Sequence, residues 1–379
     1  MSKKHNRKRK HVHRDETPAA PPPHSPEPAV SGFWQSLLGP IRRNPRASAA
    51  AAGTIAALAG AALFNRARAT RAEADTPPVG RFVEVDGVRL HYVERGEGRP
   101  VVLLHGNGAM VQDWMASGVL DAAAETYRVI AFDRPGFGHS DRPRTTVWTP
   151  TAQAALIRKA LDKIGVERPV VVGHSWGTLV ALAMALDFPQ AVAALVLMSG
   201  YYYPTVRPDV LTAMPAVPLF GDLMRLTVSP VVGRLASPLM KQAIFAPLPV
   251  ADKFDGFPME MSLRPSQIRA TAADTAMMIP AAAALSARYG ELALPVVLIA
   301  GDGDTIAFFD RHSQRLHDAL PGSELRTLAG AGHMFHYHDP DAVIAAIDRA
   351  VERSAPVTLP DGDAPRGEDI VPPAGDGSF

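Results

Sequence analysis

Serine, aspartate and histidine occur in this 379-residue chain where their side chains could together perform acyl transfer. Ser175 stands at the centre of a Gly-His-Ser-Trp-Gly run, Asp304 in a Gly-Asp-Gly-Asp run, and His333 after a small-residue run. Acyl transfer needs a nucleophile, a base that titrates near neutral pH, and an acid that orients the base. On this hypothesis Ser175 attacks a carbonyl carbon, His333 takes the serine proton and returns it to the leaving group, and Asp304 fixes the imidazole tautomer.

The elements around Ser175 predict a sharp turn between a strand and a helix. Residues 170–172 are three valines, which favour a buried strand, and residues 179–187 form an apolar run typical of a helix. Gly173 and Gly177 flank the serine, where a side chain would clash with neighbouring backbone. Such a turn holds the hydroxyl clear of the sheet, beside the positive end of the helix.

The acid and the histidine also follow predicted strands. Residues 295–301 form an apolar strand that leads to Asp304, and residues 324–328 form a short strand before His333. The chain order serine, aspartate, histidine is the order of the α/β-hydrolase arrangement. On these motifs residues 80–353 resemble the α/β-hydrolase superfamily, in its serine-nucleophile, capped form.

Two further segments carry the same resemblance. A His-Gly-Asn-Gly run starts at His105, after a predicted strand at 100–104, where the family has its oxyanion loop. Residues 133–140 are similar to the D-x-x-G-x-G-x-S segment of the family. The resemblance implies that the backbone N–H groups of Asn107 and Trp176 bind the oxyanion, and that Trp176 lines the acyl side of the pocket. We expect His105, His174 and Asp133 to support their loops rather than to react.

Neighbouring residues compete for two of the roles. Asp302 lies on the same predicted loop as Asp304, and the family spacing favours Asp304. His336 and His338 follow His333, and we expect them at the surface or at the entry of a helix. A histidine-rich tract can bind a metal, but the chain has no cysteine, and we expect neither a metal nor a cofactor.

The remaining pattern predicts an α/β-hydrolase fold with a mostly parallel, eight-stranded sheet. An Asp-Gly pair at 86–87 between apolar runs predicts a hairpin. Further strands are expected near 100, 127, 169, 191, 295 and 324, alternating with helical stretches as a parallel sheet requires. The clearest amphipathic helices are predicted at 153–164 and 340–351.

About 95 residues separate the sixth predicted strand from the seventh, far more than a connection needs. By resemblance, residues 200–290 form a helical cap. Its composition is apolar, its basic residues are sparse, and it holds seven of the thirteen methionines, which suit a surface that adapts to varied ligands. We therefore expect a small-to-medium apolar acyl or alcohol group. The large apolar residues of the predicted cap are Tyr201, Tyr202, Tyr203, Leu219, Phe220, Phe245, Phe254 and Phe257, and its methionines are Met214, Met224, Met240, Met259, Met261, Met277 and Met278.

The reaction class follows from the residue at position 175. Relatives with aspartate there form alkyl-enzyme esters, so serine disfavours haloalkane and epoxide chemistry. The main hypothesis is a carboxylesterase-like serine hydrolase. A C–C bond hydrolase or an aminopeptidase-like enzyme is the alternative, and the latter would use acidic cap residues such as Asp252, Asp255 or Glu260. A remote alternative is an inactive, membrane-held binding module.

The ends of the chain differ in composition from the predicted enzyme. Residues 1–46 hold ten Lys or Arg and three Asp or Glu, a net charge of +7 in a chain of net +1. We expect a disordered arm with a short interfacial helix at 33–41 and no nucleic-acid partner, because aromatic residues are not interleaved with the basic ones. Residues 355–379 are expected to be a disordered acidic tail.

Residues 47–64 carry no charge, and as a helix they would span about 27 Å. Ten of the eighteen are alanine, so four apolar side chains supply only roughly −2 kcal/mol of insertion energy. The excess of basic residues before this stretch predicts a single-pass anchor with the catalytic domain outside the cytoplasm. The alternatives are a cleavable export signal ending at 72–74, a twin-arginine signal at 42–43, or a soluble helix of a cytoplasmic enzyme.

Overall fold

A computed structural model describes residues 44–205 and 208–354. The predicted interfacial helix at 33–41 and the predicted tail at 355–379 lie outside the described residues. The chain divides into two units, Met1–Ala57 and Leu58–Phe379. The described part of the first unit is the beginning of one long helix, and all other elements belong to the second unit.

The second unit is built on one eight-stranded sheet, and the predicted strands are confirmed. The strand order is β1-β2-β4-β3-β5-β6-β7-β8, with β1 and β2 antiparallel to their neighbours and β3 to β8 parallel. Parallel strands are covered on both faces, which explains their nearly continuous apolar runs. The bounds are β1 Arg81–Val85, β2 Val88–Arg95, β3 Pro100–Leu104, β4 Arg128–Phe132, β5 Val170–His174, β6 Ala194–Met198, β7 Val296–Gly301 and β8 Glu324–Leu328.

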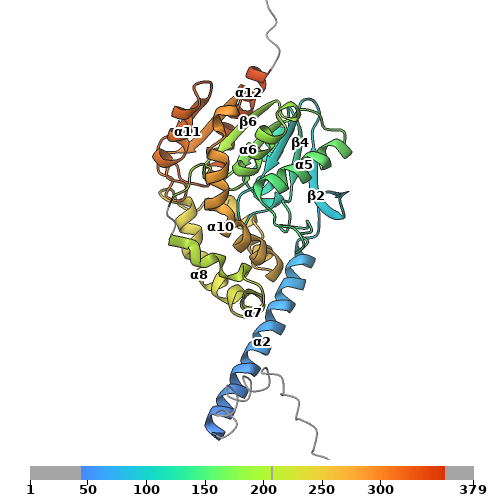
Figure 1. Cartoon of the computed structure of the whole chain (residues 1–379), viewed down its shortest axis with the longest axis vertical. Helices are drawn as coiled ribbons and strands as arrows, with labels where there is room; N and C mark the ends of the chain where they lie inside the picture. Colours follow the sequence, from blue (N-terminus) through green and yellow to red (C-terminus); the bar gives the residue numbers. More distant parts are fainter. Residues whose placement is uncertain (1–43, 206–207, 355–379) are drawn as a thin grey trace, which may run out of the picture. The chain divides into compact units, whose positions relative to one another are not determined.

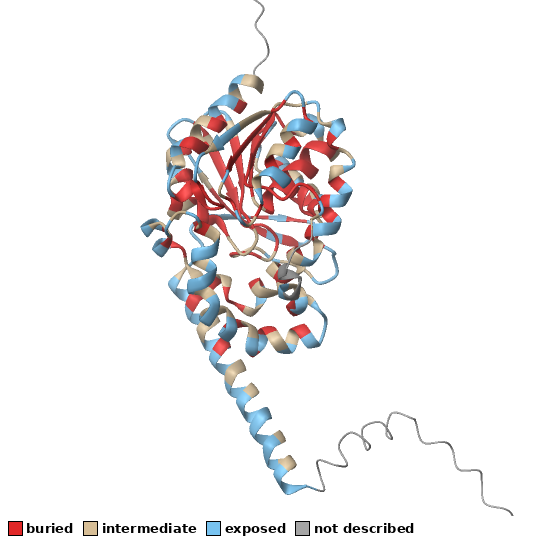
Figure 2. Ribbon diagram, turned by 90° about the vertical axis from the view of Figure 1, so that its left-hand side faces the viewer, coloured by how far each residue is buried: buried red, intermediate tan, exposed pale blue. Residues whose placement is uncertain are grey.

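Helices cover both faces of this sheet (Figure 1). One core cluster joins one face to α5 (Pro150–Lys163), α6 (Gly177–Asp187) and α11 (Ser313–Ala319). The other joins the opposite face to α3 (Val111–Ser117), α4 (Val119–Ala124) and α12 (Pro340–Ser354). Figure 2 shows the strands as the most buried part of the unit. The helices predicted at 153–164 and 340–351 correspond to α5 and α12.

Between β6 and β7 the chain forms a series of helices, which we call the helical insertion. It follows the sixth strand, where the sequence predicted a cap. Its longest members are α8, with 18 residues, and α10, with 22 residues. The bounds are η2 Pro208–Ala216, α7 Phe220–Leu226, α8 Val228–Phe245, η3 Asp252–Gly256, α9 Met259–Ser262, α10 Pro265–Ser286 and η4 Tyr289–Glu291.

The N-terminal apolar stretch belongs to α2 (Pro45–Asp75), a single helix of 31 residues. In the described part of the chain it is the one helix long and apolar enough to cross a membrane, with a mean hydropathy of 1.7 over its best window. From Leu58 onward α2 belongs to the second unit. There the Asn65 side chain donates to the carbonyl oxygens of Leu226 and Thr227 at 3.1 and 2.7 Å.

Candidate active site

Ser175 lies in the sharp turn between β5 and α6 that its sequence predicts. Its φ of +51° falls in the left-handed region, which a side chain adopts only under strain. A Cβ atom on Gly173 would come within 2.7 Å of the carbonyl oxygen of Gly177, and one on Gly177 would collide with the backbone of β3. Both glycines are therefore required by the close approach of the strand, the turn and the helix.

His333 and Asp304 form a buried pair on the loops after β8 and β7. Nδ1 of His333 lies 2.8 Å from Oδ2 of Asp304. The other carboxylate oxygen accepts hydrogen bonds from the backbone N–H groups of Ile306 and Ala307. Burial alone would raise the pKa of Asp304, but the neighbouring imidazole and these donors hold that pKa below its usual value. An ionised carboxylate in this place favours the tautomer of His333 that carries its proton on Nδ1.

The rival acid, Asp302, makes a different contact. It is exposed, and its Oδ1 accepts a hydrogen bond from the backbone N–H of Gly330 at 2.6 Å. Asp302 thus holds the loop that precedes His333, whereas Asp304 contacts the imidazole itself.

One cavity of about 620 Å³ contains both the serine and the histidine. Ser175 and His333 line it together with Asn107 of the predicted oxyanion loop. The rings of His174 and His333 are 5.0 Å apart between centroids, so the turn after β5 and the loop after β8 are in contact. The three loops that the sequence singled out therefore meet at one rim of the sheet.

The helical insertion supplies most of the remaining cavity wall. α8 and α10 contribute apolar side chains, and four of the seven methionines named from the sequence line the cavity. No Lys or Arg is among its described lining residues. The methionines are Met224, Met240, Met259 and Met278.

The oxyanion loop is fixed to the insertion by hydrogen bonds. The amide nitrogen of Asn107 donates to the carbonyl oxygen of Thr271 at 3.1 Å and to Oγ1 of Thr275 at 3.0 Å, both on α10. Beneath this loop Arg134 is fully buried and pairs with Asp274 at 2.7 Å. These contacts join the loop after β3 to α10 and so set the position of the Asn107 backbone.

The indole of Trp176 does not line the cavity, contrary to the expectation from the family. It is fully buried, its N–H donates to the carbonyl oxygen of Asp274 at 3.0 Å, and the guanidinium of Arg134 lies 4.5 Å from its ring centroid. The backbone of Trp176 caps the first turn of α6. Its N–H group, which the oxyanion hypothesis uses, is at the turn even though the side chain points elsewhere.

A cluster of polar residues lies behind the serine turn, and one member contradicts a sequence expectation. His336 was expected at the surface or at the entry of a helix, but it is completely buried, with Nε2 3.4 Å from Oδ2 of Asp113. It also packs on His174 at 4.7 Å between ring centroids. The short helix η6 (Phe335–Tyr337) turns this side chain inward, whereas His338 is exposed as expected.

Asp113 was missed because no motif surrounds it in the sequence. The fold brings it from α3 to the cluster, where its Oδ1 accepts a hydrogen bond from the Tyr337 hydroxyl at 2.9 Å. Burial raises the pKa of Asp113, but His336 and this hydroxyl together hold that pKa below its usual value. Burial lowers the pKa of His174 well below its usual value, an effect that its neighbouring imidazoles reinforce.

The cluster has the residue types of a metal site. One ligand atom from each of Asp113, His174 and His336 lies within 4.8 Å of the others. We propose that it holds no metal, because Oδ2 of Asp113 lies 3.4 Å from Nε2 of His336 and Nε2 of His174 already contacts the carbonyl oxygen of His333 at 3.2 Å.

The other residues expected to support loops make extensive buried contacts. Asp133 accepts a hydrogen bond from His91 at 2.7 Å and another from the backbone N–H of Val111 at 2.8 Å. Nε2 of His105 accepts a hydrogen bond from the backbone N–H of Arg134 at 3.0 Å. Burial, with the nearby Arg134, lowers the pKa of His105 to about 3, so this imidazole is neutral at physiological pH.

The acidic residues considered for binding a peptide amine lie away from the cavity lining. Asp252 and Asp255 are exposed on η3. Glu260 pairs with Arg68 at 2.8 Å and with Arg234 at 3.0 Å. None of the three lines the cavity, so this structure gives no support to an aminopeptidase.

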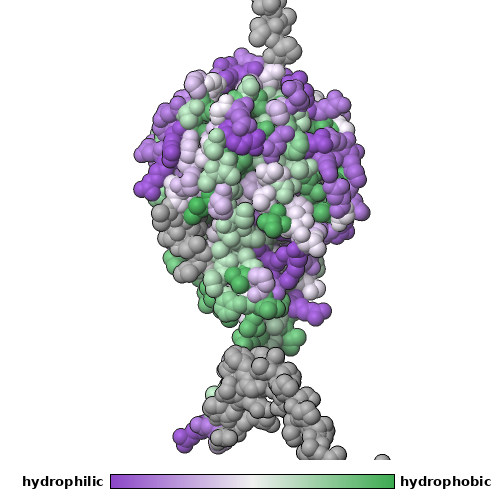
Figure 3. All heavy atoms as spheres, viewed as in Figure 1, coloured by the Kyte–Doolittle hydropathy of each residue, from purple (hydrophilic) through white to green (hydrophobic). Residues whose placement is uncertain are grey.

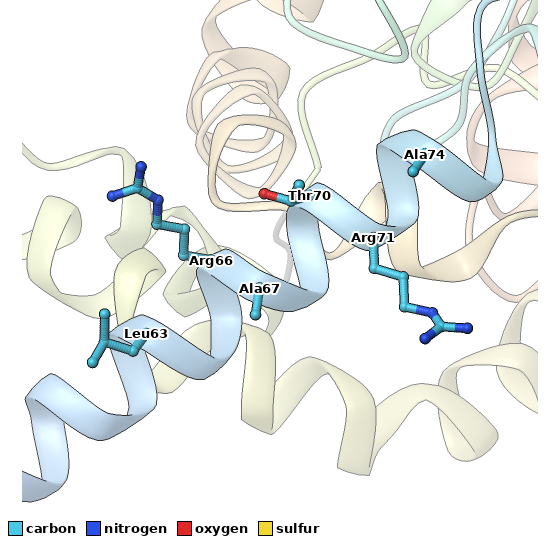
Figure 4. A pocket seen from close by; sticks show the side chains of 6 residues that line it. All are labelled: Leu63, Arg66, Ala67, Thr70, Arg71 and Ala74. Atoms are coloured by element: carbon cyan, nitrogen blue, oxygen red, sulfur yellow. The ribbon is translucent and has the colours of Figure 1, made fainter.

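A second, shallow depression of about 600 Å³ runs along α2. Six residues of that one helix line it, among them Arg66 and Arg71, which extend from the helix in different directions (Figure 4). Because no other element closes it, we assign it no ligand.

Comparison with known proteins agrees with this architecture. A family model described as alpha/beta hydrolase fold matches residues 99–340. An uncharacterised protein of Mycobacterium tuberculosis (strain ATCC 25618 / H37Rv) is 31% identical over 291 residues, which cover 74% of this chain and 83% of that protein. The 2-hydroxy-6-oxononadienedioate/2-hydroxy-6-oxononatrienedioate hydrolase of Klebsiella pneumoniae is 26% identical over 279 residues, which cover 69% and 92%.

Among solved structures, the enol-lactonase from Burkholderia xenovorans LB400 has the same fold. Its TM-score is 0.59 at 20% identity, over 72% of this chain and 100% of that one. With the family match and the sheet order, these likenesses establish the class of protein. The chain belongs to the α/β-hydrolase fold family, and it is an enzyme of the hydrolase class.

Proposed function

We propose that the protein is a serine hydrolase that cleaves a carboxylic ester through an acyl-enzyme on Ser175. The observation that carries the proposal is the pairing of His333 with Asp304 at 2.8 Å in a cavity that also contains the strained Ser175. In the first step the serine oxygen attacks the ester carbonyl while His333 takes its proton. His333 then gives that proton to the departing alcohol, and water repeats the sequence to release the acid.

We assign the oxyanion donors to the backbone N–H groups of Asn107 and Trp176. Ser175 and Asn107 both line the cavity, and Trp176 is the residue that follows the nucleophile at the start of α6. Donors held by the fold stabilise the charge that develops on the carbonyl oxygen, and losing one such donor costs about 10²–10³ in turnover. The bonds from Asn107 to α10 make the helical insertion part of this arrangement, so we propose that it serves as the cap.

The cavity favours an apolar substrate of small to medium size. Its volume is about 620 Å³, within the usual range for small-molecule sites. Methionine and other apolar side chains make up most of the lining, and no Lys or Arg is among the described lining residues. An acyl or alcohol group without a negative charge would leave fewer polar groups unpaired there than an anionic one.

A C–C bond hydrolase is the second candidate. The similarity to the Klebsiella pneumoniae hydrolase extends over most of both chains, and by its name that enzyme acts on dioates. Cleavage of such a bond can use the same serine, histidine and aspartate. A dicarboxylate needs cationic partners, however, and the described lining lacks Lys and Arg. This difference supports the ester as the preferred substrate.

We further propose that α2 anchors the protein in a membrane as a single-pass segment at 47–64. The length and hydropathy of α2 support this, as does the excess of basic residues before it. By the positive-inside tendency, that excess supports an N-terminus in the cytoplasm and a catalytic domain outside it. Retention of the intact chain in membranes after a carbonate wash is expected, and release into the supernatant would contradict the anchor.

The hydrolase proposal is tested with nitrophenyl esters of increasing chain length and a fluorophosphonate probe. We expect wild-type protein to turn over these esters and to be labelled by the probe. Ser175→Ala should lose both properties, because the nucleophilic oxygen is gone. Labelling that persists in the variant would place the nucleophile elsewhere. Rapid cleavage of a vinylogous diketone with no cleavage of any ester would favour the C–C alternative.

A further inference from the structure

The helical insertion exposes an apolar surface that a water-facing helix pair does not normally carry. On α7 the exposed residues include Phe220, Leu223 and Leu226, and on α8 they include Val232, Leu235 and Leu239. We call these six side chains the outer face. Leu235 and Leu239 are 77% and 71% exposed, so the outer face is fully presented to the surroundings of this unit. Figure 3 shows hydrophobic surface gathered at the end of the unit where α7 and α8 lie.

The exposed residues of α8 recur at helical spacing. Val232, Leu235 and Leu239 are separated by three and four residues, so they share one side of the helix. Arg234 projects to the other side, where it pairs with Glu260 at 3.0 Å. α8 is therefore apolar both on the side that lines the cavity and on the exposed side that carries Leu235 and Leu239, while Arg234 pairs with Glu260.

The charged residues of this region form ion pairs within the protein. Residues 219–240 contain three, and none is exposed. Asp222 pairs with Arg144 at 3.0 Å, Arg225 is buried and pairs with Asp222, and Arg234 pairs with Glu260. An outer surface with no exposed charge over two consecutive helices marks a site of contact with an apolar partner.

The identity of that partner follows from the neighbouring helix. In the second unit, α2 carries the exposed side chains Leu63 and Phe64 immediately before Asn65. Asn65 binds the end of α7 through the carbonyl oxygens of Leu226 and Thr227, and the guanidinium of Arg234 lies 5.5 Å from the Phe64 ring centroid. The outer face thus lies next to the part of α2 that belongs to the second unit, and α2 is the one described helix whose length and hydropathy suit a membrane.

The outer face and the catalytic cavity are separated by a single helix. Val228, Val232 and Met240 of α8 line the cavity and are 46%, 54% and 46% exposed, and Val232 also belongs to the outer face. A route between the two would pass these three uncharged side chains.

We infer that the outer face of α7 and α8 lies on the surface of a lipid bilayer and that the substrate enters the cavity from that bilayer. The substrate class is then a lipophilic acyl compound that partitions into membranes. The second half of this inference rests on the proposed ester hydrolysis, whereas the first half concerns a contact with lipid that is independent of catalysis.

Contact with lipid is measured on the full-length chain reconstituted in phosphatidylcholine vesicles. Because the chain has no cysteine, single variants can be labelled cleanly with an environment-sensitive nitrobenzoxadiazole dye. The test sites are Leu235→Cys and Leu239→Cys, which do not line the cavity. The control is Glu352→Cys on α12, whose side chain is 69% exposed.

We expect a lipid that carries a spin label on its acyl chain to quench the dyes at 235 and 239 at least about twofold more than the dye at 352. Aqueous iodide should quench in the opposite order. Equal iodide quenching at all three sites would mean that the outer face lies in water. Protection from both quenchers would mean that protein covers it, either residues 1–43 of this chain or a second copy. Either result overturns the inference.

Entry of substrate from the bilayer is tested with the double variant Leu235→Glu/Leu239→Glu. Turnover of a water-soluble, short-chain nitrophenyl ester should stay within about twofold of wild type, because neither residue lines the cavity. Turnover of a long-chain ester embedded in vesicles should fall about tenfold, since the added charges oppose contact with the hydrocarbon. An equal loss on both esters, or no loss on either, overturns this route. If wild type hydrolyses neither ester, the proposed function fails while the quenching result stands.

Discussion

Oδ2 of Asp304 lies 2.8 Å from Nδ1 of His333, and the other oxygen of this carboxylate is held by two backbone N–H groups. The acid is therefore oriented by the loop after β7 before any substrate arrives. Asp302, two residues earlier, holds the backbone of Gly330 instead. The geometry assigns the two aspartates different tasks, which substitution can separate.

Asp304→Asn should lower kcat by about 10⁴-fold, because an amide in this place stabilises the wrong tautomer of His333 and no longer balances the imidazolium. Asp302→Asn, the matched control on the same loop, should keep kcat within about twofold of wild type. Steady-state rates on a soluble ester, with folding checked by circular dichroism, measure both. A larger loss from Asp302→Asn would exchange the two assignments.

The buried ion pair between Arg134 and Asp274 predicts a large effect on stability. Both side chains are fully buried, and Asp274 also accepts from Arg142 at 2.8 Å. Asp274→Ala would leave the guanidinium of Arg134 without its counter-charge in a site closed to water. We expect a loss of about 3–5 kcal/mol in the free energy of unfolding.

The control for this effect is Arg349→Ala on α12, which breaks partly exposed pairs with Glu324 and Glu352. Exposed pairs contribute little to stability, so this variant should unfold almost as wild type does. Urea denaturation of both variants and of wild type, in one mild detergent, compares them. Similar losses in both variants would mean that Arg134 finds other partners when Asp274 is removed.

The parts of the fold that the sequence predicted are those encoded by local patterns. The valines of β5 and the glycines at 173 and 177 each have a local physical reason, since a buried parallel strand needs apolar residues and the turn leaves no room for a Cβ atom. The order of the motifs then gives the order of the loops at the rim of the sheet. For this reason the residues proposed as nucleophile, base and acid could be named from the sequence alone.

Residues outside such patterns could not be placed. Asp113 is one of several aspartates in the chain, and only the packing of α3 against η6 brings it to His336. Trp176 occupies the position of the family motif, but its indole packs against Arg134 and donates to the carbonyl oxygen of Asp274 instead of lining the cavity. Composition identified Leu219 and Phe220 as apolar residues of the predicted cap, yet it could not tell that both are exposed. Each of these outcomes depends on contacts between distant segments.

Asp113 supports the wall behind the nucleophile, and its removal should affect stability more than chemistry. Its carboxylate accepts a hydrogen bond from Tyr337 and faces His336, and all three side chains are buried. Asp113→Asn removes the buried carboxylate between Tyr337 and His336 and should cost about 1–3 kcal/mol in the free energy of unfolding. Asp255→Asn, an exposed aspartate of the insertion, is the control and should be neutral within about 0.5 kcal/mol.

The chelator EDTA distinguishes this role from metal binding at the same cluster. If Asp113, His174 and His336 act only through hydrogen bonds and charge, EDTA should leave the melting temperature of wild-type protein unchanged. A clear decrease that added zinc reverses would show that an ion occupies the cluster. In that case Asp113→Asn should also remove the sensitivity to EDTA.

Because two histidines are buried, we expect the protein to lose stability as the medium becomes acidic. Burial lowers the pKa of His105 to about 3, and it lowers the pKa of His174 well below the usual value. In the unfolded chain both imidazoles have a pKa near 6.5, so below about pH 6.5 the unfolded state binds protons that the folded state does not. Stability therefore falls with pH in this range, by about 1.4 kcal/mol per pH unit for each such histidine.

Buried carboxylates add to this loss at lower pH. Despite burial, His333 holds the pKa of Asp304 below its usual value, and hydrogen bonding by His91 has the same effect on the pKa of Asp133. Their contribution is present above about pH 4 and is lost as pH falls through their folded-state pKa values. Urea denaturation at pH 7, 6 and 5 isolates the histidines, because these carboxylates remain ionised there. His338→Ala, which removes an exposed imidazole, should leave the slope unchanged, and a flat profile from pH 7 to pH 5 would mean that His105 and His174 accept protons in the folded protein.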